Sequence, residues 1–445
     1  MAIGLINNTI LKADSSFSYA NMPAEDVIIP LTIFDKAAFD FQVAVLYAFK
    51  PPMPSNEVLK DALSKVLVYY PHLAGRFIKD DLGRTCIILN NAGVRITETY
   101  IPVTLAEQLP SINPSKDVNH LLPPVEGVEE MLQIQLNRYA CGGLVIGETS
   151  HHRVADGQSM SSFFVAWARM VRGLDLESLP YLDRLAVSQP RNPPNIEFDH
   201  ASIEFKKTTV NPDTTSVFSP IETLMITYST EFIDNLKAKV NRENCNPHQR
   251  YSTFECLLSH TWKKMTQARG LDPEESTQVR VSVNGRARIK PAVSMEYFGN
   301  LVLWAYPTLK VKEVLQESHA YVSKAIHDEV VRVDSRYFKS FIDFGAASKD
   351  VDNKGDDLEA TAPEFGNTLC PNLEVDSWLR FQFHDLDFGG GSPCAMFPPN
   401  IPVEGLIILL PTCSEDGGVD VVVSLLPEHV PLFKQISHSM DDELN

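Results

Sequence analysis

The sequence of 445 residues lacks the features that mark several large classes of protein. Its seven cysteines are scattered and none forms a C-x-x-C pair, which favours free thiols in a reducing compartment over a disulfide framework. No apolar run approaches the ~20 residues that a membrane-spanning helix needs. The N-terminal stretch has no basic region followed by an apolar core, so no secretory signal peptide is expected. These absences predict a soluble, cytoplasmic protein.

The chain is also poor in positive charge, with 39 Lys and Arg against 57 Asp and Glu and a formal net charge of −18. A nucleic-acid-binding protein needs a basic face to neutralise phosphate groups, so no nucleic-acid partner is expected. The same excess of carboxylates argues against docking on an anionic membrane. It favours cationic small molecules only weakly, because a solvated acidic surface gives the same composition. With 44% hydrophobic residues, the chain can still bury a sizeable core.

Segments with strand and helix periodicity intermix in both halves of the chain, which predicts an α/β fold with two domains. Leucine and isoleucine alternate with glutamine over 131–136, as in a half-buried strand, whereas apolar residues recur at helical spacing over 55–70. A proline-punctuated polar stretch, 188–219, shows little periodicity and predicts a long crossover linker. It would join an N-terminal domain, 1–187, to a C-terminal domain, 220–445.

The stretch Ser150–Gly157 contains two adjacent histidines and then a carboxylate. It lies between a strand-like run and a helix-like run, so it predicts a strand–loop–helix junction. An imidazole there suits proton transfer, because its unperturbed pKa is about 6.5 and a loop can present it to a substrate. Asp156 would orient His152, or would pair with a distant cation such as Arg286 and hold the loop. The spacing alone does not choose between these two roles.

Other chemistries fit the sequence less well. A zinc site at the histidine pair is not expected, because adjacent side chains rarely reach one ion and no Cys or His stands at ligand spacing. A Ser/His/Asp hydrolase is disfavoured, because no G-x-S-x-G motif is present. The glycines 389–391 lack the Lys-Ser/Thr pair of a phosphate-binding loop and indicate a tight turn. Two interpretations of the histidine remain: it acts as a general base, or it is structural.

Four segments, in order along the chain, together resemble the BAHD family of plant acyl-CoA-dependent acyltransferases. They resemble the YYPLAGR, HHxxxDG, VDGRxR…YFGN and DFGWG motifs, and here they are Tyr70–Arg76, His151–Gly157, Val283–Arg288 with Tyr297–Asn300, and Asp387–Gly391. In the last motif Gly390 replaces the usual Trp. Stretches 337–343 and 372–411 are most similar to the amine N-hydroxycinnamoyltransferases of that family.

This resemblance implies two chloramphenicol-acetyltransferase-like domains with a central solvent channel. Acyl-CoA would enter from one side as co-substrate and the acceptor from the other, with no permanently bound cofactor and with a monomeric enzyme. The implied catalytic set is His152 as general base, Trp378 as indole N–H donor to the oxyanion, and Asp156. Asp156 would act structurally, through an ion pair with Arg286. His151 receives no chemical role.

The resemblance also implies supporting positions outside the chemistry. Asp387 and Gly389 would maintain the architecture on the CoA side, so the glycine that replaces the Trp of the motif concerns local packing rather than catalysis. Ser252 and Thr253 match a hydroxyl pair near the CoA phosphates.

Acceptor specificity is predicted to depend on Glu374 and Asp376, which precede Trp378 at steps of two residues. Alternate residues of a strand face one side, so all three would point into the channel. Two carboxylates there would attract a cationic amine, unless they are merely solvated charges at a strand end. The predicted reaction transfers a hydroxycinnamoyl group to an amine of the agmatine, putrescine, tyramine or tryptamine type. The alternatives are ester formation with an alcohol and a silent CoA-ligand-binding protein.

Overall fold

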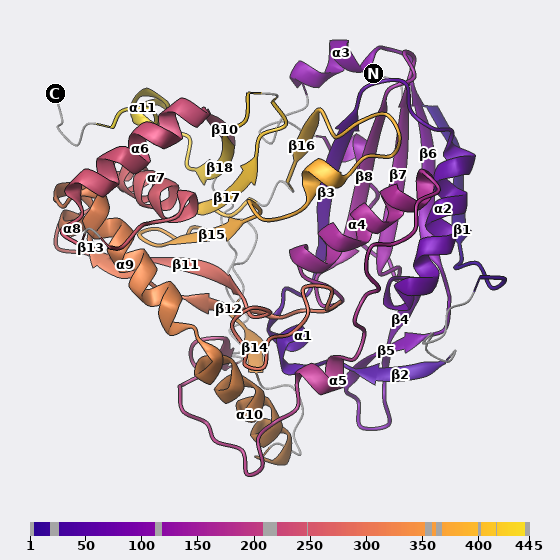
Figure 1. Ribbon diagram of the computed structural model, residues 1–445, viewed down its shortest axis with the longest axis horizontal. Coiled ribbons are helices and arrows are strands. Elements are labelled where there is room, and N and C mark those ends of the chain that lie inside the picture. Colours follow the sequence, from indigo (N-terminus) through magenta and orange to yellow (C-terminus); the bar gives the residue numbers. More distant parts are fainter. Residues whose placement is uncertain are drawn as a thin grey trace.

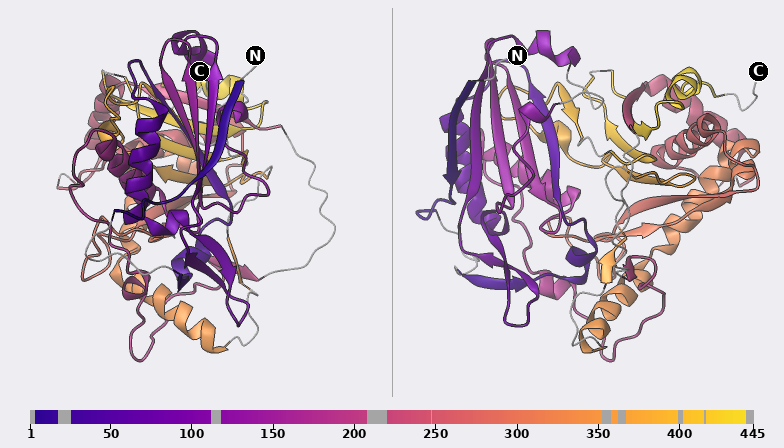
Figure 2. Two further views of the ribbon diagram at one scale, coloured as in Figure 1. Left: turned by 90° about the vertical axis from the view of Figure 1, so that its right-hand side faces the viewer. Right: turned by 180° about the vertical axis from the view of Figure 1, so that it is seen from behind.

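The two halves of the chain each build a mixed sheet covered by helices, and they lie side by side in Figure 1. The computed structural model describes residues 4–17, 26–111, 118–207, 220–246, 248–351, 358–361, 367–398, 402–414 and 416–440. The view from behind in Figure 2 shows the N-terminal sheet and the helix-rich C-terminal half on opposite sides of the molecule. This arrangement confirms the α/β class with two domains.

The N-terminal sheet has six strands in the order β1-β6-β7-β8-β3-β16. Only the β6–β7 pair is parallel. Its strands are β1 (Gly4–Leu11), β3 (Gln42–Phe49), β6 (Val94–Ile101), β7 (Leu132–Tyr139), β8 (Leu144–His151) and β16 (Ala395–Phe397). Two helices pack on it, α2 (Asn56–Tyr69) and α4 (Gly157–Val171), and α2 begins after a Ser55 cap and buries the expected leucine and valine stripe.

The C-terminal sheet has seven strands, of which six follow the order β10-β18-β17-β15-β11-β12. Its strands are β10 (Glu222–Tyr228), β11 (Ser276–Asn284), β12 (Val302–Ala305), β13 (Thr308–Lys310), β15 (Leu373–Ser377), β17 (Leu406–Pro411) and β18 (Val419–Leu425). The helices of this half are α6 (Thr230–Glu243), α7 (Thr253–Arg269), α8 (Val311–Gln316), α9 (His319–Arg332), α10 (Ser335–Val351) and α11 (Val430–Ile436).

Shorter elements connect these layers. The strands are β2 (Val27–Pro30), β4 (Arg76–Lys79) and β5 (Thr85–Leu89) in a small sheet, and β9 (Phe205–Lys207) paired with β14 (Leu358–Ala360). The helices are α1 (Ile33–Ala37), α3 (Leu105–Gln108), α5 (Arg184–Val187), η1 (Pro71–Ala74), η2 (Leu109–Ser111), η3 (Asn119–Leu121) and η4 (Phe383–Asp385). Within the described residues, no helix combines the length and apolarity needed to cross a bilayer.

Segments of each half pack in the layer that the other half mainly builds. Strand β16, far beyond the linker in sequence, completes the N-terminal sheet by pairing with β3. Phe383 and Phe388 are buried in the N-terminal core, whereas Phe34 of α1 is buried in the C-terminal core. Such exchange of segments between layers joins the halves into one packed unit. Of the predicted linker, 208–219 lies outside the described residues.

Candidate active site

A cavity with about 1350 Å³ of space, its open mouth included, lies between the two halves. The N-terminal half contributes β3, β8 and the first turns of α4 to its walls, and the C-terminal half contributes β11, β12, β15 and β17. Four residues singled out in the sequence line it together: His152, Asp156, Asp376 and Trp378. A mostly apolar cleft with a few convergent polar groups is typical of a ligand site.

His152 lies immediately after β8 and before α4, at the strand–turn–helix junction that the sequence predicts. Strand alternation continues through the turn, so Glu148, Ser150 and His152 all line the cavity. The His152 backbone N–H donates to the Phe41 carbonyl over 3.0 Å, and its ring lies edge-on to Phe39 at 5.3 Å. Its buried Nδ1 atom has no hydrogen-bond partner among the described residues.

Asp156 is paired with Arg286, the second of the two arrangements that the sequence leaves open. The guanidinium donates two hydrogen bonds to the carboxylate, over 2.8 and 3.0 Å, and both side chains are buried. The backbone N–H groups of Ser159 and Leu301 each donate to Asp156 over 3.0 Å. Burial is the largest single influence and raises the pKa of Asp156, but Arg286 and the two backbone N–H groups together outweigh it and lower that pKa. The carboxylate therefore holds the turn and leaves the imidazole free.

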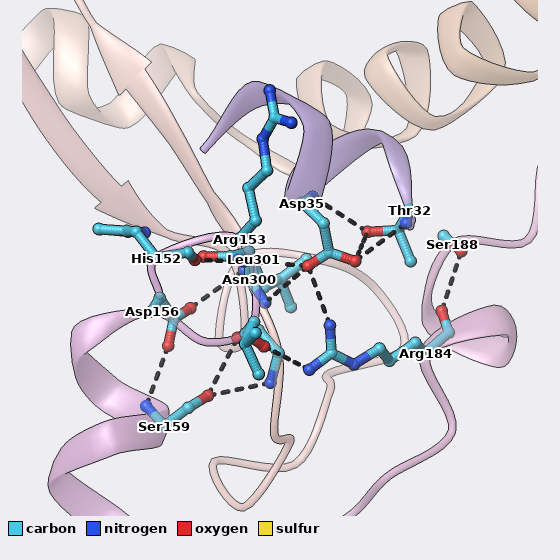
Figure 3. Close-up of polar contacts among 12 residues, drawn as sticks. Thr32, Asp35, His152, Arg153, Asp156, Ser159, Arg184, Ser188, Asn300 and Leu301 are labelled. Carbon is cyan, nitrogen blue, oxygen red and sulfur yellow. Dashed lines mark hydrogen bonds and ion pairs between the residues drawn. The ribbon is translucent and has the colours of Figure 1, made fainter. Parts of the chain in front are cut away.

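A second buried carboxylate, Asp35, holds the same turn from the other side and was not found in the sequence (Figure 3). Its Oδ1 accepts from Asn300 Nδ2 over 3.0 Å and from Arg184 Nη1 over 3.2 Å. Asn300 Nδ2 also donates to the His152 carbonyl over 2.9 Å, and Arg184 donates to the Val154 carbonyl. The backbone on both sides of residue 153 is thus fixed by one charged cluster.

A signal for this cluster exists in the sequence. Thr32 stands three residues before Asp35 inside an otherwise apolar run, a spacing that predicts a helix cap. In the structure Thr32 caps α1, and both its N–H and its hydroxyl donate to Asp35 over 2.9 Å. Asn300 belongs to the matched motif Tyr297–Asn300, but the motif does not reveal which backbone carbonyl it binds.

His151 points away from the cavity, because consecutive residues at a strand end face opposite sides. Its ring packs edge-on against Phe77 at 4.7 Å, and its Nε2 lies 3.6 Å from Asp40. Burial lowers the pKa of His151 to about 4, so the ring is neutral near pH 7. The two histidines cannot share an ion. Among the described residues, no three His, Cys, Asp or Glu side chains gather as a metal site would require.

Trp378 and Asp376 lie where β15 ends at the cavity. Both side chains are half-buried and line it, with Ser377 between them. The Trp378 backbone N–H donates to the Leu409 carbonyl over 2.7 Å, and its indole stacks on Phe381 with 6.0 Å between ring centroids. The neighbouring strand β17 and the ring of Phe381 therefore hold the Trp378 indole at the cavity wall.

Strand alternation predicts that Glu374 faces the cavity, but Glu374 is not among the residues that line it. Only 3% of the residue is exposed, and its carboxylate oxygens lie 3.2 and 3.3 Å from Arg280 Nη1. The physical reason is the pairing of β15 with β11, which places Glu374 directly opposite Arg280. The same guanidinium lies 3.9 Å above the Trp304 ring, so the ion pair is enclosed behind the cavity wall. Burial raises the pKa of Glu374 to about 7.

Ser252 and Thr253 lie at the start of α7, outside the cavity wall. Ser252 is exposed and caps the helix, with its Oγ accepting from the Glu255 N–H over 3.2 Å and donating to the Glu255 carboxylate over 2.7 Å. The N-terminus of a helix is a favourable place for an anion. The predicted contact of these two residues with CoA phosphates stays a prediction.

Asp387 organises a glycine turn on the surface of the N-terminal layer. Its Oδ1 accepts from the N–H groups of Gly389 and Gly391 over 2.7 and 2.8 Å, and its Oδ2 lies 3.3 Å from Arg172. Gly389 has a φ of +104°, which favours glycine because a Cβ is strained there. None of these residues lines the cavity.

Gly390, which replaces the usual Trp, lies in a place without room for a side chain. A Cβ there would overlap the Pro52 carbonyl oxygen and would lie 2.6 Å from the Met53 sulfur. Phe388, the Phe of the same motif, anchors the segment in the core, because its buried ring packs edge-on against Phe49 and Trp167. The turn thus keeps its attachment to the core without the larger side chain.

Comparison with known proteins supports the resemblance read from the motifs. The model of the Transferase family matches residues 11–440. Tryptamine hydroxycinnamoyltransferase 2 of Oryza sativa subsp. japonica is 48% identical, over 92% of this chain and 93% of its own. Agmatine coumaroyltransferase-1 of Hordeum vulgare is 41% identical, over 93% and 94%. The crystal structure of F. graminearum TRI101 with coenzyme A and deoxynivalenol shares the fold, with a TM-score of 0.74, 17% identity and coverage of 92% and 97%. The chain therefore belongs to the BAHD family of acyl-CoA-dependent acyltransferases.

Proposed function

We propose that this enzyme transfers a hydroxycinnamoyl group from its CoA thioester to the nitrogen of an amine, which gives an amide and free CoA. The observation that carries the proposal is the charge of the cavity that contains His152. Asp376 lines it, whereas no lysine or arginine does so within the described residues. A cationic acceptor meets a complementary charge there, and an acidic acceptor meets none. The activities named for the rice and barley relatives support the same class of acceptor.

His152 serves as the general base of this reaction. The amine nitrogen attacks the thioester carbonyl carbon, a C–N bond forms, and the imidazole takes the proton from the nitrogen. The C–S bond then breaks, and the imidazolium returns that proton to the departing thiolate. Asn300 and Asp156 act as positioning residues, because they hold the backbone of the turn rather than the imidazole itself.

Trp378 is proposed to donate its indole N–H to the oxyanion of the tetrahedral intermediate. A preorganised donor of this kind contributes ~3 kcal/mol to transition-state stabilisation. Asp376 is proposed to attract the acceptor as an ammonium, which releases its extra proton to solvent before attack. Ser252 and Thr253 are proposed to contact the CoA phosphates, and the enclosed Glu374 supports the wall through its ion pair.

We also propose that the enzyme acts as a monomer in the cytoplasm, with acyl-CoA as a co-substrate and no permanently bound cofactor. Light scattering after size exclusion is expected to give the mass of a single chain. A stable dimer at micromolar concentration would contradict this part of the proposal.

The direct experiment offers the purified protein coumaroyl-CoA together with a panel of amines and alcohols, and identifies products by mass. Amides are expected from agmatine, putrescine, tyramine or tryptamine. Products that are exclusively esters would favour the O-acyltransferase, and the absence of any thioester cleavage would favour a silent binding protein. In Asp376→Thr the KM for the amine should rise by about 10-fold or more. An unchanged amine KM would refute the role of Asp376.

A further inference from the structure

Glu148 is a carboxyl group in the cavity wall that the proposed chemistry does not use. It lies on β8, four residues before His152, and lines the same cavity. Only 2% of the residue is exposed, and its Oε2 atom has no hydrogen-bond partner among the described residues. A buried acceptor without a partner costs free energy, so such an atom in a ligand cavity points to a partner that the ligand supplies.

The surroundings of Glu148 suit a neutral donor rather than a cation. The facing strand β3 presents Val43, Val45 and Tyr47 along this part of the cavity, with Val45 directly opposite Glu148. Burial raises the pKa of Glu148 to about 8, and the Ser150 side chain lowers it by a smaller amount through a hydrogen bond. The carboxyl is therefore mostly protonated near pH 7, and its free oxygen accepts a hydrogen bond without the cost of an enclosed charge.

From this geometry we infer that Glu148 is a specificity residue that accepts a hydrogen bond from the polar tip of an aromatic substrate. The donor is an aromatic O–H or N–H at the end of a ring, either the phenol of the hydroxycinnamoyl group or an indole N–H of the acceptor. The inference deepens the proposed function and rests on it for the identity of the two substrates.

The distance along the strand is consistent with a substrate that spans from His152 to Glu148. Four residues of extended chain cover roughly 13 Å, and both side chains enter the same cavity. A hydroxycinnamoyl group carries its phenol at the opposite end from the thioester carbonyl, where His152 acts. Tryptamine is a shorter molecule between its amine and its indole N–H. The two candidate donors differ in which substrate preference is lost when Glu148 is replaced.

The test compares Glu148→Leu and Glu148→Gln with the unsubstituted enzyme, using coumaroyl-CoA and cinnamoyl-CoA, which lacks the phenol. If the phenol is the donor, the unsubstituted enzyme should prefer coumaroyl-CoA in kcat/KM by about 10- to 100-fold, the usual value of a hydrogen bond to a buried acceptor. Glu148→Leu should reduce this preference to about 1, whereas Glu148→Gln retains a carbonyl acceptor and should keep part of it. Asp420→Asn is the matched control, because Asp420 is a buried carboxyl outside the cavity.

A second arm compares tryptamine with 2-phenylethylamine, which has no indole N–H. If Glu148→Leu abolishes a preference for tryptamine and leaves the acyl preference intact, the donor is the acceptor's indole. If the acyl preference is lost instead, the donor is the phenol. Unchanged ratios in both arms would overturn the inference. A loss confined to diamines, equal in Glu148→Gln and Glu148→Leu, would also overturn it, because a cation would then be the ligand.

Equilibrium binding separates this inference from the proposed function. The affinities of coumaroyl-CoA and cinnamoyl-CoA can be measured by titration calorimetry without an acceptor, and those of tryptamine and 2-phenylethylamine without acyl-CoA. If the unsubstituted chain forms no amide but shows one of these preferences, and Glu148→Leu loses it, the proposed function fails and the inference stands. If amides form but neither binding nor turnover depends on the aromatic donor, the proposed function stands and the inference fails.

Discussion

Single residues decide the chemistry, and the two adjacent histidines show how. His152 lines the cavity, and its Nδ1 has no partner among the residues that the structure describes, whereas His151 packs outside the cavity against Phe77. We expect His152→Ala to lower kcat by at least ~100-fold with an unchanged circular dichroism spectrum, because the amine loses its base. His151→Asn keeps a side-chain acceptor for the Arg153 N–H and should lower kcat by less than about 10-fold. Near-normal turnover by His152→Ala would show that His152 is not the general base.

Glu148 makes a separate prediction for stability against pH. Its pKa is raised to about 8 in the folded protein, whereas an unfolded glutamate titrates near about 4.3. Between these values the unfolded chain has released a proton that the folded chain retains, so the free energy of unfolding falls as pH rises. The side chain of Glu148→Gln does not titrate, so its free energy of unfolding does not fall in this way. Urea denaturation should show the variant close to the unsubstituted protein at pH 5, and more stable by ~3–5 kcal/mol at pH 8. Equal differences at both pH values would contradict the raised pKa.

At the scale of elements, the glycine turn that begins at Asp387 has a structural task. Gly390→Ala is expected to lower the free energy of unfolding by about 1–3 kcal/mol, because the added Cβ overlaps the Pro52 carbonyl oxygen. The kcat should stay within about 3-fold, since the turn lies outside the cavity. Gly4→Ala is the control: its Cβ would have no neighbour nearer than 3.9 Å, and stability should change by less than about 0.5 kcal/mol. Loss of activity without loss of stability would assign the turn a role in catalysis.

The junction of β8 with α4 shows why an element can be predicted while its contacts cannot. The alternation before His151 and the helical spacing after Gly157 are local properties, and both elements form as the sequence indicates. The position of β15 beside β11 is a long-range property. It pairs Glu374 with Arg280 and removes that carboxylate from the cavity, which no pattern within residues 373–377 could reveal.

At the scale of the whole molecule, the ion pair of Asp156 with Arg286 links the two halves beside the active site. Arg286→Met would leave a buried carboxylate without its cation, so the free energy of unfolding should fall by about 3–5 kcal/mol. Adding Asp156→Asn should restore part of that loss, which urea denaturation of the four proteins would measure as a coupling energy. Arg332→Ala, which breaks an exposed ion pair, should change stability by less than about 1 kcal/mol. If Arg286→Met also lowered the free energy of unfolding by less than about 1 kcal/mol, the ion pair would not bridge the halves as inferred.

Residues of each half also pack in the hydrophobic core of the other half. Phe34 packs in the C-terminal core, and Ile408 and Val422 pack in the N-terminal one. Strand β16 also completes the sheet of the other half. The active site contains residues of both halves. We therefore infer that it forms only when the two halves of the chain have packed together.

By itself, the sequence determined the α/β class, the junction that presents His152, and the family, because periodicity and short motifs are written in neighbouring residues. Only the tertiary structure decided which histidine faces the cavity, that Asp156 binds Arg286, and that Asp35 anchors the turn from 117 residues earlier in the chain. It also enclosed Glu374 in an ion pair with Arg280 and placed Glu148 in the cavity wall. The physical reason is that burial and charge pairing depend on which strands become neighbours, and this follows from packing of the whole chain.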